Sequence, residues 1–262
     1  MGRFGRPDRR LSVLEIVKTG TLDLKLAGLL WLLMEHRASV LVAAGPSFAG
    51  KTTTLNVLLD FLPPNVKQVD LRGYGEDFKF LESATPADTY LVAEEFSDYM
   101  DYVWGDTALR AFALVTNGYG LGGTIHARTA KEALLVLHEY LEVPLEVLAR
   151  LGAIVILRAT PGRLYGSEPV RRIESVSLVL PHEEGIAIQV IASREMGSDT
   201  FVIPQPKALH DALAAKFAVG RKDVADDMMA REKLLAELQK NGKITRDEVR
   251  KAVVEFYESR RS

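Results

Sequence analysis

The octapeptide GPSFAGKT at residues 45–52 constrains the fold of this chain more than any other feature. It fits the pattern G-x-x-x-x-G-K-[ST], in which glycines let the backbone turn tightly so that its N–H groups point at phosphate oxygens. An apolar run at residues 39–44 predicts a buried strand before it, and residues 52–61 predict a helix that ends at Pro63 and Pro64. A strand, this turn and a helix form the context in which the pattern binds phosphate, which disfavours a chance glycine-rich turn.

This segment, called the phosphate loop below, supplies most of the predicted ligand contacts. Lys51 is expected to reach the β- and γ-phosphates of ATP, and the Thr52 hydroxyl is expected to bind Mg²⁺. The N-terminus of the following helix adds partial positive charge. The predicted nucleotide-binding residues are Gly45, Pro46, Ser47, Phe48, Ala49, Gly50, Lys51, Thr52 and Thr53.

Composition narrows the class of protein. The chain has 262 residues, of which 47% are hydrophobic, and this size predicts one large domain or one domain with a small appendage. A net charge of -2 gives no reason to expect a nucleic-acid partner. The absence of cysteine excludes disulfides, thiolate metal sites and thiol nucleophiles. The longest apolar run, residues 26–34, is too short to span a bilayer and is not placed like a signal peptide, so we expect a cytoplasmic protein.

Two further predicted strands deliver polar side chains near the phosphate loop. The apolar run at residues 89–93 ends in two acids, of which Glu94 is predicted to activate the attacking water and to bind Mg²⁺ through water, whereas Glu95 is expected only to face solvent. Residues 121–127 predict a glycine-weakened strand that carries His126, for which we predict sensing of the γ-phosphate. The predicted catalytic set is therefore Glu94, Lys51 and His126. Alternatively, Glu94 is an ordinary loop acid and His126 is a structural histidine.

The rest of the chain predicts a sheet with an antiparallel extension and a helical end. Runs at residues 66–71 and 153–157 predict strands, and the alternating segments 171–180 and 186–192 predict a hairpin. Helical periodicity marks the C-terminal part at residues 207–219, 224–240 and 246–259.

The segments GPSFAGKTT, LVAEE and GDTALRAFALVTNGYGLGGTIHA resemble, in this order, the motor domain of the secretion-ATPase family. That family drives type II secretion, type IV pili, archaeal flagella and type IV secretion, and the C-terminal helices are similar to those of its archaeal-pilus and Tad-pilus branch. The resemblance is specific from about residue 38 to residue 128 and extends over roughly residues 10–258. By position, Glu94 matches the family's water-activating glutamate and His126 matches its γ-phosphate-sensing histidine.

The resemblance implies an α/β fold: a RecA-like P-loop NTPase core with a mostly parallel sheet, a β-hairpin extension and a C-terminal helical tail. We expect an N-terminal arm and linker at residues 1–23, the ATPase domain at 24–205 and a helical subdomain at 206–262. The implied protein is an ATP-hydrolysing motor subunit for pilus assembly or protein secretion, with ATP and Mg²⁺ bound at the interfaces of a homo-hexamer. The implied partner is an inner-membrane platform protein, which allows peripheral attachment at the cytoplasmic face of the membrane.

Several departures from the family pattern favour other functions. The segment at residues 63–88 is much shorter than in the family and keeps only Asp70 and Arg72 as remnants of its acidic and arginine motifs. Ala93 replaces the glycine before the glutamate, and Phe48 is bulky where small residues are usual. These features favour a nucleotide-binding regulatory or structural subunit with weak or no ATPase activity. A DNA translocase or helicase on the same core is a third alternative, which the near-neutral charge disfavours.

Overall fold

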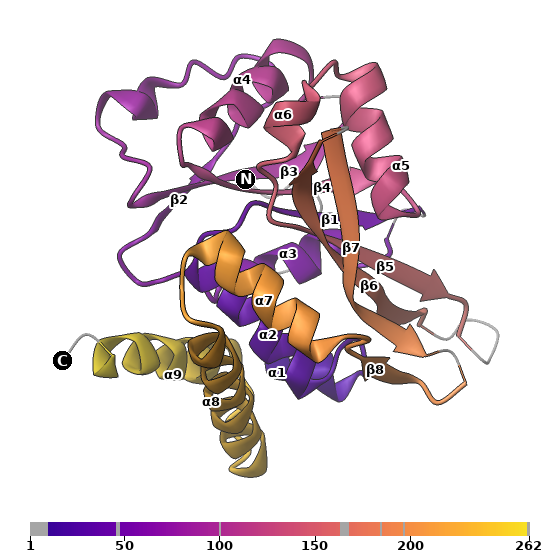
Figure 1. Cartoon of the computed structure of the whole chain (residues 1–262), viewed down its shortest axis with the longest axis vertical. Coiled ribbons are helices and arrows are strands. Elements are labelled where there is room, and N and C mark those ends of the chain that lie inside the picture. Colours follow the sequence, from indigo (N-terminus) through magenta and orange to yellow (C-terminus); the bar gives the residue numbers. More distant parts are fainter. Residues whose placement is uncertain are drawn as a thin grey trace.

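An eight-stranded sheet with helices on both faces runs through the part of the chain that the computed structural model describes, which is residues 10–45, 48–99, 101–162, 168–183, 185–195 and 197–260 (Figure 1). The strands are β1 Val40–Ala44, β2 Lys67–Asp70, β3 Thr89–Phe96, β4 Gly120–His126, β5 Ala153–Thr160, β6 Val170–His182, β7 Gly185–Glu195 and β8 Thr200–Val202. The helices are α1 Val13–Lys18, α2 Leu24–Glu35, α3 Lys51–Leu59, the 3₁₀ turn η1 Lys79–Glu82, α4 Gly105–Thr116, α5 Ala130–Leu135, the π-helical turn η2 Val136–Tyr140, α6 Leu145–Leu148, α7 Pro206–Phe217, α8 Arg221–Lys240 and α9 Arg246–Ser259.

The strand order is β2-β3-β4-β1-β5-β6-β7-β8. The first five strands are parallel, and β6, β7 and β8 continue the sheet in antiparallel fashion. All five residues of β1 are buried, as expected for a parallel strand covered on both faces. Because parallel strands end at the same edge of a sheet, the phosphate loop, the end of β3 and the end of β4 meet there. We call this side the carboxyl edge.

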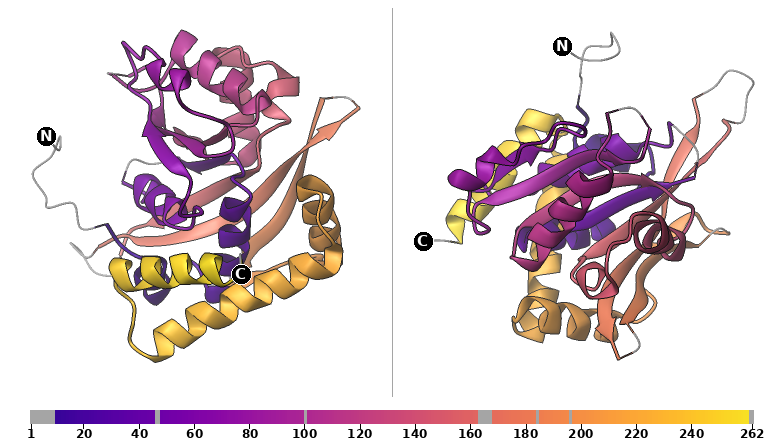
Figure 2. Two further views of the ribbon diagram at one scale, coloured as in Figure 1. Left: turned by 90° about the vertical axis from the view of Figure 1, so that its left-hand side faces the viewer. Right: turned by 90° about the horizontal axis from the view of Figure 1, so that it is seen from above.

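Two apolar layers pack on the sheet. Helices α4, α5 and α6 cover one face, and α1, α2, α3 and the C-terminal helices cover the other. Figure 2 shows α8 and α9 lying along the layer that contains α1 and α2. Trp31 anchors this layer, because its ring stacks on Phe61 at 5.1 Å and its indole N–H donates to the Tyr257 hydroxyl at 2.9 Å. The predicted fold class, an α/β core with a β-hairpin extension and a helical tail, is confirmed.

The main departure from the predicted elements is in β3, which continues through both acids to Phe96. The predicted helices and strands elsewhere are present within a few residues, and the hairpin forms between β6 and β7. The division into an arm, a core and a helical subdomain stays a prediction, and the first nine residues of the arm lie outside the described residues. In the described part of the chain, no helix combines the length and apolar character needed to cross a membrane.

Candidate active site

The phosphate loop closes the carboxyl end of β1 and opens α3. Gly50 is the N-cap of α3 and has a φ of 93°, a left-handed conformation that strains any residue with a Cβ. A Cβ at Gly50 would also meet the Arg171 side chain at 3.1 Å. Within the described residues, no side chain caps α3. The N–H groups of its first turn are therefore available to an anion.

The other predicted loop residues differ in exposure. Phe48 also has a left-handed φ of 61°, and it is 90% exposed, whereas Ala49 is buried. Thr52 and Thr53 are exposed at the start of α3. Two predicted ligands, Pro46 and Ser47, lie outside the described residues.

The ammonium of Lys51 lies between a carboxylate and an imidazole. Nζ is 3.6 Å from Glu95 Oε2 and 3.0 Å from His126 Nε2, and the same Nε2 is 3.1 Å from Glu95 Oε1. The Lys51 side chain is only 7% exposed. Burial lowers the pKa of Lys51, and the Glu95 carboxylate opposes that shift. The structure thus brings together two of the three predicted catalytic residues, Lys51 and His126, with Glu95 as their neighbour.

The expectation that Glu95 only faces solvent is wrong, and a β-bulge explains why. Val92 packs in the layer that contains α3, so an unbroken strand would turn Glu94 toward the phosphate loop. Instead, Ala93 pairs with Gly123 of β4 while Phe96 pairs with Ile125, so β3 carries one extra residue.

The bulge changes which carboxylate reaches the lysine. Glu95 is 16% exposed on its side chain and contacts Lys51, whereas Glu94 is exposed. Both acids border a cavity whose lining includes Arg72 and Asp101. The Thr124 hydroxyl donates to the Glu94 carbonyl oxygen at 2.7 Å and so fixes the bulged backbone. The catalytic role assigned to Glu94 stays a prediction, and Glu95 becomes the stronger candidate.

The position of His126 follows from strand register. His126 pairs with Ala44, the last residue of β1, and its Nδ1 lies 3.2 Å from the Gly45 carbonyl oxygen. A carbonyl oxygen can only accept, so this contact is satisfied by a hydrogen on Nδ1, and Nε2 lies 3.0 Å from Lys51 Nζ and 3.1 Å from Glu95 Oε1. The ring thus contacts both Lys51 and Glu95, and γ-phosphate sensing stays a prediction.

Two arginines that the sequence did not single out approach the phosphate loop. Arg171 of β6 donates from Nε to the Phe48 carbonyl oxygen at 3.2 Å. Arg128 lies so close to Gly45 that a Cβ there would meet its Cγ at 2.7 Å. The position of Arg128 just after β4 was a usable signal, but no local pattern points to Arg171. These guanidinium groups bring positive charge to the loop, and the ion pair of Arg171 with Glu168, at 3.8 Å, offsets part of it.

A cavity of about 410 Å³ opens beside the phosphate loop. It has an apolar wall from α1 and β5 and a polar wall from α3 and β6. Its lining includes Leu11, Ile16, Gly50, Thr53, Leu157 and Arg171. The volume lies within the range of small-molecule sites, about 300–1,000 Å³.

The residues at the loop fit a magnesium ion of the kind that accompanies nucleotide phosphates. Mg²⁺ keeps several waters and usually takes only one or two protein oxygens. The exposed Thr52 hydroxyl, next to Lys51 at the start of α3, supplies one such oxygen. Over the described ranges, no three or more histidine and acidic side chains gather as a metal cage. The predicted contact of Glu94 with the ion through water stays a prediction.

Comparison with known proteins gives relatives of low identity. No family model matches the chain. Two uncharacterized proteins of Methanocaldococcus jannaschii, MJ1287 and MJ0900, are 25% and 23% identical to it. These matches cover 93% and 97% of this chain, and 97% and 48% of the respective relatives.

Similar solved structures are ATPases. The VirB11 ATPase from the Brucella suis type IV secretion system has a TM-score of 0.39 and 18% identity, and the match covers 63% of this chain and 54% of that one. The ATPase DotB of Legionella pneumophila has a TM-score of 0.36 and 13% identity, and the match covers 96% of this chain and 64% of that one. DotB of Yersinia pseudotuberculosis has a TM-score of 0.39 and 11% identity, and the match covers 87% of this chain and 60% of that one. The chain thus spans 54 to 64% of the length of these proteins, so their activities belong to larger molecules.

Proposed function

We propose that this chain binds ATP with Mg²⁺ at the phosphate loop and hydrolyses it, as a motor subunit for pilus assembly or protein secretion. The observation that carries the proposal is the cluster at the carboxyl edge, where Lys51 Nζ lies 3.6 Å from Glu95 and 3.0 Å from His126. This cluster stands beside the N-terminus of α3, which no side chain of the described residues caps. A buried cation, a carboxylate and an anion-binding backbone are the parts that phosphoryl transfer to water requires.

Each residue has a role in the proposed reaction. The loop backbone and the first turn of α3 bind phosphate oxygens. Lys51 moves away from Glu95 and neutralises the charge that develops on these oxygens. Glu95, freed from the lysine, accepts the proton of the attacking water. Thr52 would hold the metal ion, which supplies charge neutralisation at the phosphates. His126 follows the movement of Lys51 through the contact at Nε2.

The cavity next to the loop supports a nucleoside as the rest of the ligand. Thr53 and Gly50 form part of both the loop and the cavity, so a ligand with its phosphates on the loop extends into the cavity. Leu11 and Leu157 offer an apolar surface of the kind that packs against a base, and Arg171 lies at the junction with the phosphates.

Exposed aromatic rings support assembly around this site. Phe48, Tyr74 and Tyr99 are 90%, 95% and 67% exposed, and they follow the ends of β1, β2 and β3 at the carboxyl edge. Large exposed aromatic residues are typical of protein interfaces. We propose that a second copy covers them. A hexamer and a platform protein at the cytoplasmic face of a membrane rest on the sequence resemblance.

A second function, a nucleotide-binding subunit with little turnover, draws support from the resting contacts of Lys51. In the structure this ammonium is paired with Glu95 and His126, so a bound nucleotide competes with both for the lysine. A chain that never frees Glu95 would bind nucleotide without hydrolysing it.

Steady-state hydrolysis of ATP by the purified chain tests the proposal. Lys51→Ala is expected to abolish turnover, with Lys131→Ala, an exposed lysine at the start of α5, as the matched control. Light scattering with and without nucleotide reports assembly. Nucleotide binding without turnover above the Lys51→Ala background would contradict the motor function and favour the second candidate.

A further inference from the structure

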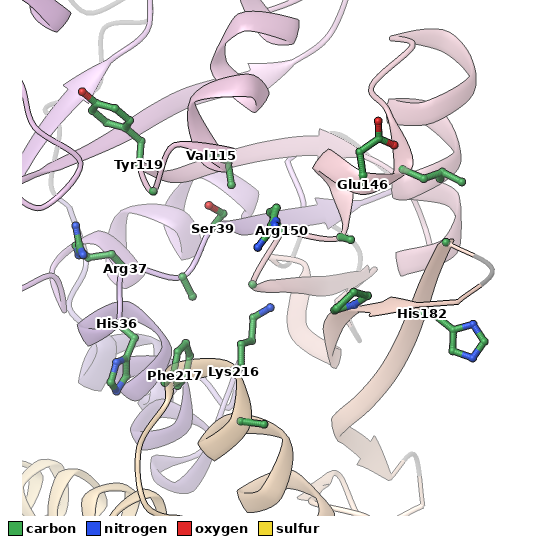
Figure 3. A pocket seen from close by; sticks show the side chains of 18 of the residues that line it. His36, Arg37, Ser39, Val115, Tyr119, Glu146, Arg150, His182, Lys216 and Phe217 are labelled. Atoms are coloured by element: carbon green, nitrogen blue, oxygen red, sulfur yellow. The ribbon is translucent and has the colours of Figure 1, made fainter.

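A second large cavity lies at the opposite edge of the sheet from the phosphate loop. Its volume is about 810 Å³, and it opens where β1, β4 and β5 begin, between α6, α7 and the β6–β7 turn (Figure 3). The five residues of β1, about 16 Å of strand, separate it from the phosphate loop. A ligand here therefore occupies a site separate from the phosphate loop.

Two cations face each other across this cavity. Lys216 extends from the last turn of α7 toward Arg150, which follows α6 (Figure 3). The positive charge of Arg150, together with burial as the larger effect, lowers the pKa of Lys216. Like charges that face each other are unfavourable, and neither cation forms an ion pair with an acid of the described residues, so this arrangement favours a compensating anion.

The protein itself uses only part of the hydrogen-bonding capacity of these cations. Lys216 Nζ donates to the carbonyl oxygens of Leu151 and Val179, at 3.0 and 3.1 Å. An ammonium has three N–H donors, so one remains. The side chain of Arg150 is exposed and makes no hydrogen bond or ion pair with another residue of the described ranges, while its backbone N–H donates to the Val147 carbonyl oxygen.

The surroundings select a carboxylate rather than a phosphate. The backbone groups beside Lys216 are the carbonyl oxygens of Leu151 and Val179, which repel the several oxygens of a phosphate, whereas phosphate sites present N–H groups. Exposed Glu146 and Glu183 on the rim disfavour a ligand of high negative charge. One carboxylate is matched by one ammonium donor and one guanidinium.

The size and walls of the cavity indicate what carries the carboxylate. The ring of His36 stacks on Phe217 at 4.1 Å, and Tyr119 lines the cavity as well. An isolated carboxylate fills only a small part of about 810 Å³, which leaves these aromatic walls to a larger ligand. We infer that the cavity binds an acidic peptide segment of a partner protein, with one Asp or Glu carboxylate held between Lys216 and Arg150.

Selection of peptides from a random display library on the immobilised full chain tests this inference without knowledge of the partner. Peptides with Asp or Glu are expected to be enriched on the wild type and on Lys207→Met, which removes an exposed charge from the same helix. They are expected to be lost on Lys216→Met and on Arg150→Gln. Since the side chain of Arg150 has no hydrogen-bond or ion-pair partner in the described structure, that variant tests the site even if Lys216→Met folds poorly.

The affinity of a selected peptide, measured by fluorescence anisotropy, completes the test. Each substitution is expected to weaken binding at least about tenfold, the equivalent of one charge-assisted hydrogen bond. Replacing the peptide's acid by its amide should have the same effect. Enrichment without acids, equal binding to Arg150→Gln, or glutarate or inorganic phosphate binding as tightly as the peptide would each overturn the inference.

Discussion

Exchange of the two neighbouring acids of β3 for their amides discriminates between the roles that the bulge assigns to them. Glu95→Gln removes the carboxylate that lies 3.6 Å from Lys51 Nζ, and Glu94→Gln changes the adjacent, exposed side chain on the other side of the bulge. The two substitutions are chemically identical. A difference between them therefore reports position alone.

The structure gives the size of the expected effect on stability. At 3.6 Å, two unit charges in a medium of effective dielectric about 20 attract by about 4.6 kcal/mol. The amide oxygen that Glu95→Gln introduces can still accept from the lysine, and His126 remains a partner, so we expect a net loss of about 1–3 kcal/mol in the free energy of unfolding. Glu94→Gln should stay within about 0.5 kcal/mol of the wild type.

Thermal unfolding and ATP hydrolysis measure the two consequences. Glu95→Gln is expected to lower the melting temperature by roughly 2–10 °C and the turnover rate by about 10²–10⁴-fold, the range for loss of a general base. Glu94→Gln should change neither by much. Loss of turnover in Glu94→Gln with normal turnover in Glu95→Gln would refute the reasoning from the bulge.

Three further predictions concern other parts of the molecule. Tyr257→Phe removes a buried hydroxyl that accepts from Trp31 and should lower the free energy of unfolding by about 1–3 kcal/mol, measured by urea denaturation, with nucleotide affinity unchanged. Burial lowers the pKa of His36 from 6.5, so the unfolded chain takes up the proton first as the pH falls, and the stability of the folded chain should decrease below about pH 6.5. His36→Phe, which can still stack on Phe217, should flatten this pH dependence of the melting temperature. Arg171→Met should weaken ADP binding in calorimetry at least about fivefold through loss of a cation at the loop, and an unchanged affinity would remove Arg171 from the site.

Features set by local sequence could be predicted. The phosphate loop was recognisable because its glycines, its lysine and the helix that follows are neighbours in the chain, and Gly50 adopts the left-handed conformation that the pattern requires. The hairpin of β6 and β7 was predictable for the same reason, because alternation in two segments that are close in sequence indicates the pairing. His126 came from its place at the end of a strand.

The choice between Glu94 and Glu95 depends on a register shift that the residues of β3 do not encode by themselves. The shift arises from pairing with β4, where Thr124 holds the bulged carbonyl and Gly123 leaves so little room that a Cβ would meet the Phe96 ring at 2.4 Å. Alternation along an isolated strand gives the opposite answer. A rule that assigns the acid by counting from the last apolar residue therefore fails wherever the neighbouring strand forces an extra residue.

The remaining site residues are joined only by the tertiary fold. Arg171 reaches Phe48 across 123 positions of sequence, and Lys216 donates to Leu151 across 65. Both contacts form because the antiparallel strands and α7 fold back over a sheet whose first five strands are parallel. This folding back imposes no fixed sequence spacing between the residues that meet. The same folding back places the cations Lys216 and Arg150 at the start of β1 and Arg171 at its end. The C-terminal half of the chain thus contributes charge to both ends of the core, and ligand binding at either end should depend on it.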